Sequence, residues 1–295
     1  MYVSVRDFTV IWVGYEDLIK GLKDLGIDRY ELYVNKTLSQ DVYEDMGHVV
    51  KLGFNLRDSY ERQEFLRFSE NTGIKPCVIL LENDFSNEDL EEELNYIKKA
   101  TQLADEIGIE VIRINSHMQI SEEKPIEEYS KQFVEIMKYL IRETNGSSVV
   151  YAVENHGYVS NDERFLNYVF REINDDRVGL TLDTGNFYWY GYPLSKVYQL
   201  IEKYANLVKH THLKNLKYPE VKREKQRSPG EDFPEVGVPL YEGDIDLKKV
   251  IQVLRKAGYT SDLTIEDESL GKYTQEERKI ILKKDVEYIK KLISE

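Results

Sequence analysis

Two histidines at the end of an apolar stretch are the first residues whose types and spacing point to chemistry. Residues Leu207–Asn215 read LVKHTHLKN, and the apolar start and short length of this stretch predict a buried strand. Successive side chains of a strand point to opposite faces, so His210 and His212 share one face. A single histidine in a strand is most often a hydrogen-bonded core residue. Here, however, three other predicted strands also end in a carboxylate, and this coincidence favours a functional site.

The three carboxylates follow apolar runs that end in VENHG, LDTGN and IEDE, and they are Glu154, Asp183 and Glu266. Buried ionised carboxylates are costly without a partner, and a shared cation removes that cost. Together with His212 they offer oxygen donors and one nitrogen. Such a set suits Mn²⁺, Mg²⁺ or Co²⁺ better than a structural zinc site, which prefers thiolate and imidazole. We therefore predict one divalent ion, with Mn²⁺ first and Zn²⁺ still allowed; a structural salt-bridge network is the alternative.

A short apolar run, a loop and an amphipathic stretch alternate along the whole chain and predict eight strands and eight helices. The predicted strands are Tyr2–Val10, Arg29–Val34, Lys75–Leu81, Glu110–Ser116, Ser148–Asn155, Val178–Asn186, Leu207–Asn215 and Asp262–Glu268. The predicted helices are Tyr15–Leu25, Ser59–Asn71, Asn87–Ile107, Ile126–Arg142, Asp162–Ile173, Leu194–Tyr204, Leu247–Ala257 and Thr274–Ile293.

This alternation, with no shift in composition, predicts an α/β fold in which residues 1–295 form a single-domain (β/α)8 TIM barrel. A doubly wound open sheet is the alternative, but the glycine-rich phosphate turn that it normally carries after the first strand is missing from the sequence. In a (β/α)8 barrel the active site lies at the C-terminal ends of the strands. The barrel would therefore bring the carboxylates and His212 together.

Two stretches interrupt the pattern. Asn35–Asp58 is a long loop, which we expect to be functional or to carry short helices. Leu216–Tyr241 is a polar insertion whose cations would either form an anion gate over the barrel mouth or simply lie in a solvated loop, as charge runs usually do. These cations are Lys217, Lys222, Arg223, Lys225 and Arg227.

The overall composition limits the partners that we expect. The net charge of -14 argues against a general nucleic-acid or membrane-surface binder. The single cysteine, Cys77, cannot form an internal disulfide, which favours a reducing compartment. The N-terminus has neither the basic flank nor the apolar core of a signal peptide, and no apolar run is long enough to span a bilayer. We expect a cytoplasmic protein.

The ordered motifs resemble those of a known superfamily. ENHG after a strand, then LTLDTGN, HTHLKN and YEGDID, and finally LTIEDE after a helix and AGY, are similar to the xylose-isomerase-like barrels, in particular to their sugar-phosphate isomerase/epimerase branch. The motifs match in order and spacing over about residues 150–270, whereas the first half matches only in layout.

The resemblance implies a role for each matching residue. Glu154, Asp183, His212 and Glu266 match the ligands of the family's divalent metal. Glu154 and Glu266 also match the pair that exchanges protons with either face of the substrate carbon in its ketose epimerases. A cation that holds a hydroxy-carbonyl compound acidifies the neighbouring C–H bond, so a carboxylate can take that proton through an enediolate. Glu268 would share a strand face with Glu266 and could exchange roles with it.

Further side chains are expected near the substrate: Asn186, His210, Trp189, Arg113, Lys214, His117 and Glu31. Asn186 and His210 match positions that contact substrate or support the ligands, and support is favoured for His210. Trp189 would stack on a sugar face.

The remaining candidates are chosen by their position in the predicted strands and not by a sequence motif. Glu31 and Arg113 lie on strands where the family has polar pocket residues, and His117, at the end of a strand, is as easily a packing residue. Lys214-Asn215 departs from the His-x-Lys-Asp pattern of many relatives, so a negatively charged supporting residue is absent there. His156 is expected to contact a loop or helix.

The predicted function is a divalent-metal-dependent isomerase or epimerase of a small sugar, ketose or polyol derivative. A keto-polyol dehydratase begins with the same proton abstraction and is the nearest alternative. A DNA-repair nuclease resembling endonuclease IV is disfavoured, because that branch needs three metal ions and several histidines, and the chain has five histidines and Asn186 at one expected position. A non-catalytic sugar-binding barrel is disfavoured by the intact carboxylate set. The expected partner is a sugar or sugar phosphate, with no nucleic acid and no membrane; a homo-oligomer is left open.

Overall fold

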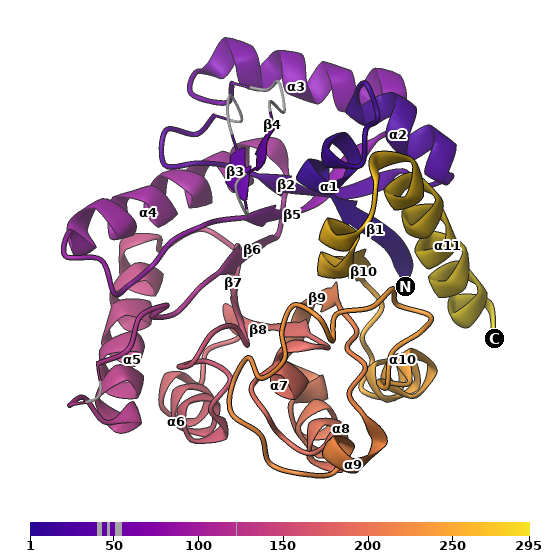
Figure 1. The fold of residues 1–295 in the computed structure, drawn as a ribbon. Helices are drawn as coiled ribbons and strands as arrows, with labels where there is room; N and C mark the ends of the chain where they lie inside the picture. Colours follow the sequence, from indigo (N-terminus) through magenta and orange to yellow (C-terminus); the bar gives the residue numbers. More distant parts are fainter. Residues whose placement is uncertain (40–42, 46–47, 51–54, 122) are drawn as a thin grey trace.

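The computed structural model describes residues 1–39, 43–45, 48–50, 55–121 and 123–295 (Figure 1). Within these residues, eight parallel strands close a barrel in the ring order β1-β10-β9-β8-β7-β6-β5-β2. The predicted (β/α)8 barrel is therefore confirmed. The strands are β1 (Tyr2–Arg6), β2 (Arg29–Tyr33), β5 (Lys75–Leu80), β6 (Val111–Ile114), β7 (Val150–Glu154), β8 (Val178–Asp183), β9 (Val208–Leu213) and β10 (Asp262–Ile265).

Helices surround the ring of strands on its outside (Figure 1). The longer ones are α2 (Leu18–Leu25), α3 (Ser59–Thr72), α4 (Leu90–Ile107), α5 (Ile126–Glu143), α6 (Glu163–Ile173), α8 (Leu194–Tyr204), α10 (Leu247–Lys256) and α11 (Gln275–Ser294). Short helices connect them, namely α1 (Asp7–Trp12), α7 (Asn186–Trp189), α9 (Glu220–Arg223) and the 3₁₀ turns η1 (Ala205–Leu207) and η2 (Glu268–Lys272).

Local signals set the limits of the helices. In α4 the side chain of Asp89 accepts the N–H of Glu92 at 2.9 Å, and the helix ends at Gly108, whose φ of 75° is left-handed. In α11 the side chains and N–H groups of Thr274 and Glu277 form a reciprocal capping box.

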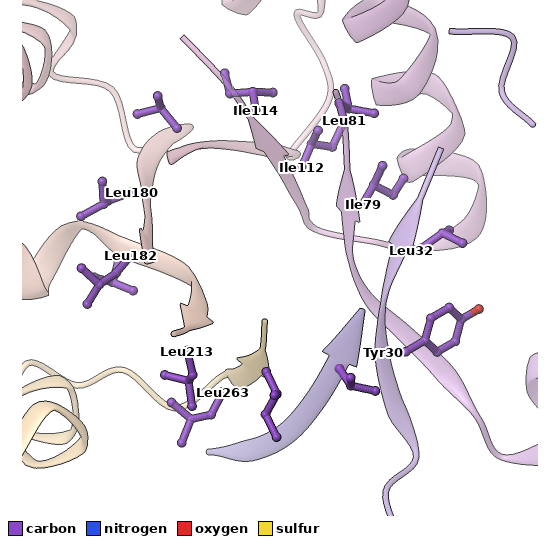
Figure 2. Packing of buried hydrophobic residues seen from close by; sticks show 14 of the residues in the cluster. Tyr30, Leu32, Ile79, Leu81, Ile112, Ile114, Leu180, Leu182, Leu213 and Leu263 are labelled. Atoms are coloured by element: carbon purple, nitrogen blue, oxygen red, sulfur yellow. The ribbon is translucent and has the colours of Figure 1, made fainter. Parts of the chain in front are cut away.

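Residues of the barrel strands alternate between an apolar outer side and a polar inner side. Figure 2 shows side chains such as Leu32, Leu180 and Leu182 on the outer side of the ring, where they face the helices. Their sequence neighbours point into the ring. A shift of a strand by one residue would turn its polar and charged side chains toward the helices, so the alternation fixes the register of the strands. The buried polar residues of the strands include Ser4, Glu31, Arg113, Thr181, Asp183, His210, His212 and Thr264.

The first strand is shorter than expected. The prediction of a strand over Tyr2–Val10 is wrong beyond Arg6, because α1 follows β1 directly. The carboxylate of Asp7 accepts the N–H of Phe8 at 2.7 Å and that of Tyr33 at 3.0 Å, which turns the chain into the helix and ties it to β2. The apolar residues after Asp7 fit both strand and helix spacing, so periodicity could not separate the two.

The strand that was expected over Val178–Asn186 ends at Asp183. Oδ1 of Asp183 accepts the N–H groups of Gly185 at 2.7 Å and Asn186 at 2.8 Å, and α7 begins there. The strand end is thus set by a side chain that also belongs to the predicted site.

The last strand ends at Ile265 and does not continue to Glu268. Asp267 accepts the N–H of Ser269 at 2.8 Å and caps η2, which begins at Glu268. The prediction that Glu268 shares a strand face with Glu266 is therefore wrong, because the chain has left the strand direction.

The two interruptions of the pattern have different structures. In Asn35–Asp58, β3 (Tyr43–Asp45) pairs antiparallel with β4 (His48–Val50), and the described part of this stretch holds no helix; residues 40–42, 46–47 and 51–54 lie outside the described residues. The insertion Leu216–Tyr241 is closed at its base by an antiparallel bridge between Leu216 and Gly237.

Candidate metal and substrate site

Four side chains from consecutive strands meet at the C-terminal end of the barrel. Glu154 ends β7, Asp183 ends β8, His212 lies one residue before the end of β9, and Glu266 follows β10 directly. One nitrogen or oxygen atom of each lies within 4.8 Å of the others, and all four residues are buried. The fold thus brings the predicted set together, and we call these four residues the donor cluster.

Glu154 and His212 each present one atom to the donor cluster and hold the other on a neighbouring side chain. Oε2 of Glu154 accepts a hydrogen bond from Nε of Arg113 at 2.5 Å, whereas Oε1 lies 3.3 Å from Nδ1 of His212. Nε2 of His212 lies 3.0 and 3.1 Å from the two oxygens of Glu31. Oε1 of Glu154 and Nδ1 of His212 therefore face each other at the centre.

Asp183 divides its oxygens in the same way. Its Oδ1 is held by the two backbone N–H groups at the start of α7. Its Oδ2 is buried, and its described contact is an ion pair with the ammonium of Lys214 at 3.1 Å, without hydrogen-bond geometry. One oxygen therefore fixes the side chain, and the other is available to a ligand.

Glu266 completes the set. Its Oε1 forms an ion pair with the guanidinium of Arg6, whereas Oε2 lies 3.2 Å from Nδ1 of His212 and 3.6 Å from Nζ of Lys214. All four donor residues thus have one anchored atom and one atom directed at a common centre.

Burial and charge shift the protonation of the cluster. Burial raises the pKa of Asp183 to about 7, against the effect of the Lys214 ammonium. Burial alone would lower the pKa of His212, but the surrounding carboxylates outweigh it and hold this pKa well above its usual value. Burial would raise the pKa of Glu154, but Arg113 and His212 hold it well below its usual range. The raised pKa values of His212 and Asp183 mean that both groups bind protons more readily than usual. They do so because the neighbouring cations do not balance the negative charge of the buried carboxylates.

This chemistry fits a divalent cation. Ions held at about 2.0–2.4 Å need donor atoms within about 4–5 Å of one another, which the 4.8 Å limit of the cluster meets. A cation would also supply the positive charge that the proton on His212 and the ammonium of Lys214 provide now. The residues that would hold it are Glu154, Asp183, His212 and Glu266.

Two of the predicted substrate residues border the donor cluster. Nδ2 of Asn186 donates to Oε1 of Glu154 at 3.2 Å, and its Oδ1 accepts from Nζ of Lys214 at 3.2 Å. Lys214 also forms an ion pair with Glu268 at 2.9 Å, which brings that residue to the site although its strand was predicted wrongly.

Three other predicted residues lie against the donor cluster from the inside of the barrel. Arg113, Glu31 and His210 are 3%, 1% and 0% exposed. Such burial leaves little of their surface for a substrate, and each of them contacts a donor residue or a residue that does: Arg113 pairs with Glu154, and Glu31 with His212 and His210.

The structure does not bring His117 and Trp189 into contact with the donor cluster. The ring of His117 packs edge-on against Tyr129 at 5.1 Å and against Phe85 at 6.2 Å, because the chain has already left β6. The ring of Trp189 lies edge-on to Tyr158 at 5.8 Å.

The sequence analysis missed two residues of the site. Arg6, which pairs with Glu266, was assigned to the middle of a longer strand. His156 lies at the edge of the site, with Nδ1 at 3.0 Å from Oδ1 of Asn115 and 3.3 Å from Nη2 of Arg113, and does not merely contact a loop or helix. No strand signal placed His156 at the site, because β7 ends at Glu154 and alternation along a strand does not extend past its end.

Three of the five cations of the insertion contact other residues of the protein. Lys222 forms ion pairs with Glu231 and Asp232, and Arg223 with Asp244. The guanidinium of Arg227 lies over two tyrosine rings that meet edge-on, 4.4 Å from the centre of Tyr188 and 3.7 Å from that of Tyr218. These contacts argue against a role of these cations as an anion gate over the barrel mouth.

The fold and the site define a (β/α)8 barrel with a buried carboxylate–imidazole cluster at its C-terminal mouth. The family model described as "Xylose isomerase-like TIM barrel" matches residues 19–292, and the chain belongs to this family. The resemblance seen in the sequence motifs is thereby confirmed.

Solved structures of the same fold cover almost the whole chain. The IolI protein with a bound zinc atom is 20% identical, with a TM-score of 0.70 over 97% of this chain and 96% of that one. L-ribulose 3-epimerase is 14% identical, with a TM-score of 0.67 over 100% and 95%. The probable 3-DHS dehydratase AsbF from Bacillus anthracis is 15% identical, with a TM-score of 0.64 over 98% and 99%. At these identities the likeness shows the fold.

No curated protein matches the sequence. Among the described residues, none of the helices has the length and apolar character needed to cross a membrane.

Proposed function

We propose that the protein is a divalent-metal-dependent isomerase or epimerase that acts on a small sugar, ketose or polyol derivative. The observation that supports this most is the orientation of the four side chains in the donor cluster. Each of Glu154, Asp183, His212 and Glu266 has one atom anchored by the protein and one directed at a shared centre. A salt-bridge network alone would not need four such side chains from four consecutive strands.

A bound cation would polarise a hydroxy-carbonyl substrate and so acidify its neighbouring C–H bond. Arg113 keeps Glu154 ionised, and Arg6 and Lys214, together with His212, keep Glu266 ionised, so that both glutamates are proton acceptors at neutral pH. Each carboxylate oxygen has two lone pairs, so an anchored carboxylate can still take up a proton. One glutamate would remove the proton from carbon and the other would return one.

Lys214 and Asn186 would handle the substrate oxygens. The ammonium of Lys214 is a donor beside Asp183 and Glu266, where negative charge on a substrate oxygen would need stabilisation. Asn186 presents both an amide donor and a carbonyl acceptor at the same place. The preference for manganese remains part of this proposal, and the zinc in the IolI structure shows that a barrel of this fold can hold a different ion.

The first test is the metal content of the purified protein, with Mn²⁺ reconstitution. We expect about one divalent ion per chain, lost in His212→Ala and retained in the control variant His117→Ala, whose ring packs away from the cluster. No ion in the wild-type protein after reconstitution would overturn the proposal.

The second test is a screen of ketoses and polyol derivatives in deuterated water. Solvent deuterium in the carbon skeleton without loss of water supports an isomerase or epimerase. Net loss of water would instead assign the dehydratase reaction, which begins with the same proton abstraction. In either case Glu154→Gln should abolish deuterium incorporation.

A further inference from the structure

A chain of buried hydrogen bonds runs beneath the donor cluster, through the interior of the barrel. Nε2 of His212 and Nε2 of His210 both face Glu31, and their distances to its Oε1 are 3.0 and 2.8 Å. The two imidazole rings lie 4.8 Å apart and nearly perpendicular, at 80°. Glu31 comes from β2, which is separated from β9 by the two strands β1 and β10, so it reaches both rings across the barrel interior.

Asp262 closes the far end of this chain. Its Oδ2 lies 2.8 Å from Nδ1 of His210. Asp262 is itself held in place, because its Oδ2 accepts from the hydroxyl of Thr264 at 2.8 Å and its Oδ1 accepts from the hydroxyl of Tyr259 at 3.0 Å. His210 therefore lies between carboxylates from two other strands, with a hydrogen bond from Nε2 to Glu31 and an ion pair of Nδ1 with Asp262.

We propose that Glu31, His210 and Asp262 are positioning residues that select Nδ1 of His212 as the metal-binding nitrogen. The inference rests on the proposed function. Both oxygens of Glu31 lie within 3.1 Å of Nε2 of His212, so this nitrogen carries the proton and donates it to Glu31. When a cation takes the place of the second imidazolium proton, Nδ1 is left with its lone pair directed at the centre of the donor cluster. His210 and Asp262 fix the carboxylate of Glu31 in the required orientation.

A carboxylate that accepts the second N–H of a ligating histidine fixes its ring and raises its basicity, and loss of such a partner typically weakens metal binding by about 10–100-fold. The side chain of Glu31 is 1% exposed and those of His210 and Asp262 are fully buried. Because they are buried, these three residues are placed to support the ligand histidine and not to contact the substrate.

A second cation between Glu31, His210 and His212 is the competing interpretation, because these residues also present donor atoms within 4.8 Å of one another. A cation there would have to displace the hydrogen bonds at 2.8–3.1 Å that now join them. The hydrogen bonds therefore favour a single ion at the donor cluster, and the stoichiometry decides between the two.

The experiment measures the zinc affinity of the full chain by competition with a chromophoric chelator. We expect one site in the wild type and about 10–100-fold weaker binding in Glu31→Gln, which keeps the volume but replaces one acceptor oxygen by a donor. Asp262→Asn, at the far end of the chain, should weaken binding by a smaller factor. Glu93→Gln is the matched control, because Glu93 is an equally buried carboxylate on α4 and should leave the affinity unchanged.

The nitrogen that binds the metal is read directly from the ¹⁵N resonances of the histidine side chains in the zinc-loaded wild-type protein. We expect His212 to bind through Nδ1 and to keep a proton on Nε2. This measurement decides the proposal even if the variants of Glu31 do not fold.

The failures are distinguishable. A wild type that binds no zinc or manganese overturns the proposed function and this inference with it. A wild type that binds one ion with Nε2 of His212, or with an affinity that Glu31→Gln leaves unchanged, overturns only the inference. Two ions per chain would assign the second cation site instead.

Discussion

Arg113 and Glu154 form an ion pair that is almost fully buried, with 4% and 1% of their side chains exposed. The partners lie on the adjacent strands β6 and β7, and Arg113 also donates to the backbone oxygen of Leu81 at 2.9 Å. Removal of one partner from such a pair leaves an uncompensated charge in the interior. The arginine thus fixes a donor residue and at the same time contributes to the stability of the barrel.

We expect Arg113→Met to lower the free energy of unfolding of the metal-free protein by about 3 kcal/mol, because the buried Glu154 loses its guanidinium partner and keeps, of its described partners, only Asn186 and His212. Urea unfolding at neutral pH measures this loss. The control Arg171→Met removes an ion pair whose arginine is 66% exposed, and it should change stability very little. If Arg113→Met lowers the free energy of unfolding no more than the control does, the ion pair does not stabilise the fold.

At the scale of single residues, the sequence indicated the donor cluster but not its supports. Alternation along a strand is a local property, and it was enough to assign Glu154, Asp183 and His212 to one side of their strands. The pairing of Arg6 with Glu266 depends on β1 lying next to β10 where the ring closes, and that of Glu31 with both histidines depends on which strands face each other across the ring. Spacing along the chain carries no such information.

Helix α11 is joined to the loop after β10 by two carboxyl groups that face each other. Asp285 of α11 and Asp267 of the loop are buried, and Oδ2 of each has no hydrogen-bond partner among the described residues. Burial raises the pKa of Asp267 to about 6, and burial together with Asp267 raises that of Asp285 well above its usual value. A proton shared between the two oxygens would satisfy both. Oδ1 of Asp285 also accepts the N–H of Leu240 at 2.9 Å, which fastens the end of the insertion.

We expect Asp285→Asn to stabilise the metal-free protein above pH 7. A carboxyl group with a raised pKa in the folded state contributes stability below its unfolded pKa, near 4, and loses it as the pH rises through its folded pKa, which is about 6 for Asp267 and well above the usual value for Asp285. The amide removes one ionisable group and can donate to Asp267, so the free energy of unfolding at pH 8 should rise by about 1–2 kcal/mol.

Thermal unfolding of wild type and variant between pH 4 and pH 9 measures this difference. The exposed neighbour Glu287→Gln on the same helix is the control and should follow the wild-type profile. Equal profiles for wild type and Asp285→Asn would mean that the two carboxyl groups are not coupled.

At the scale of elements, the number, type and order of the barrel units were predictable, but several ends were not. β1 and β10 are shorter than expected, because Asp7 and Asp267 accept backbone N–H groups immediately after the strands. Side-chain caps of this kind compete with a continued strand and leave the apolar periodicity unchanged. The long stretch 35–58 has little periodicity, so its short antiparallel pair could not be foreseen.

The donor cluster joins four strands that form half of the ring, so a bound ion should stabilise the barrel as a whole. A ligand that binds only the folded state adds about 2.7 kcal/mol at a free concentration of 100 times its Kd. For a chain of this size we expect Tm to rise by roughly 4–5 °C. Addition of Mn²⁺ to the metal-free protein, followed by a chelator, measures the shift and its reversal. An equal shift in His212→Ala would place the stabilising ion elsewhere.

The ring closes where the beginning and the end of the described fold meet. β1 pairs with β10 from Tyr2 with Asp262 to Val5 with Ile265, and Arg6 reaches Glu266 over a separation of 260 residues. At about 5–20 residues per second, a ribosome releases Glu266 roughly 13–50 s after Arg6. During that interval β1 has an unpaired edge and Arg6 lacks the carboxylate that it will bind. The nascent chain therefore cannot bind the cation before its last strand is made, and protection of the waiting β1 edge, by a chaperone or by transient contacts, becomes a requirement of its synthesis.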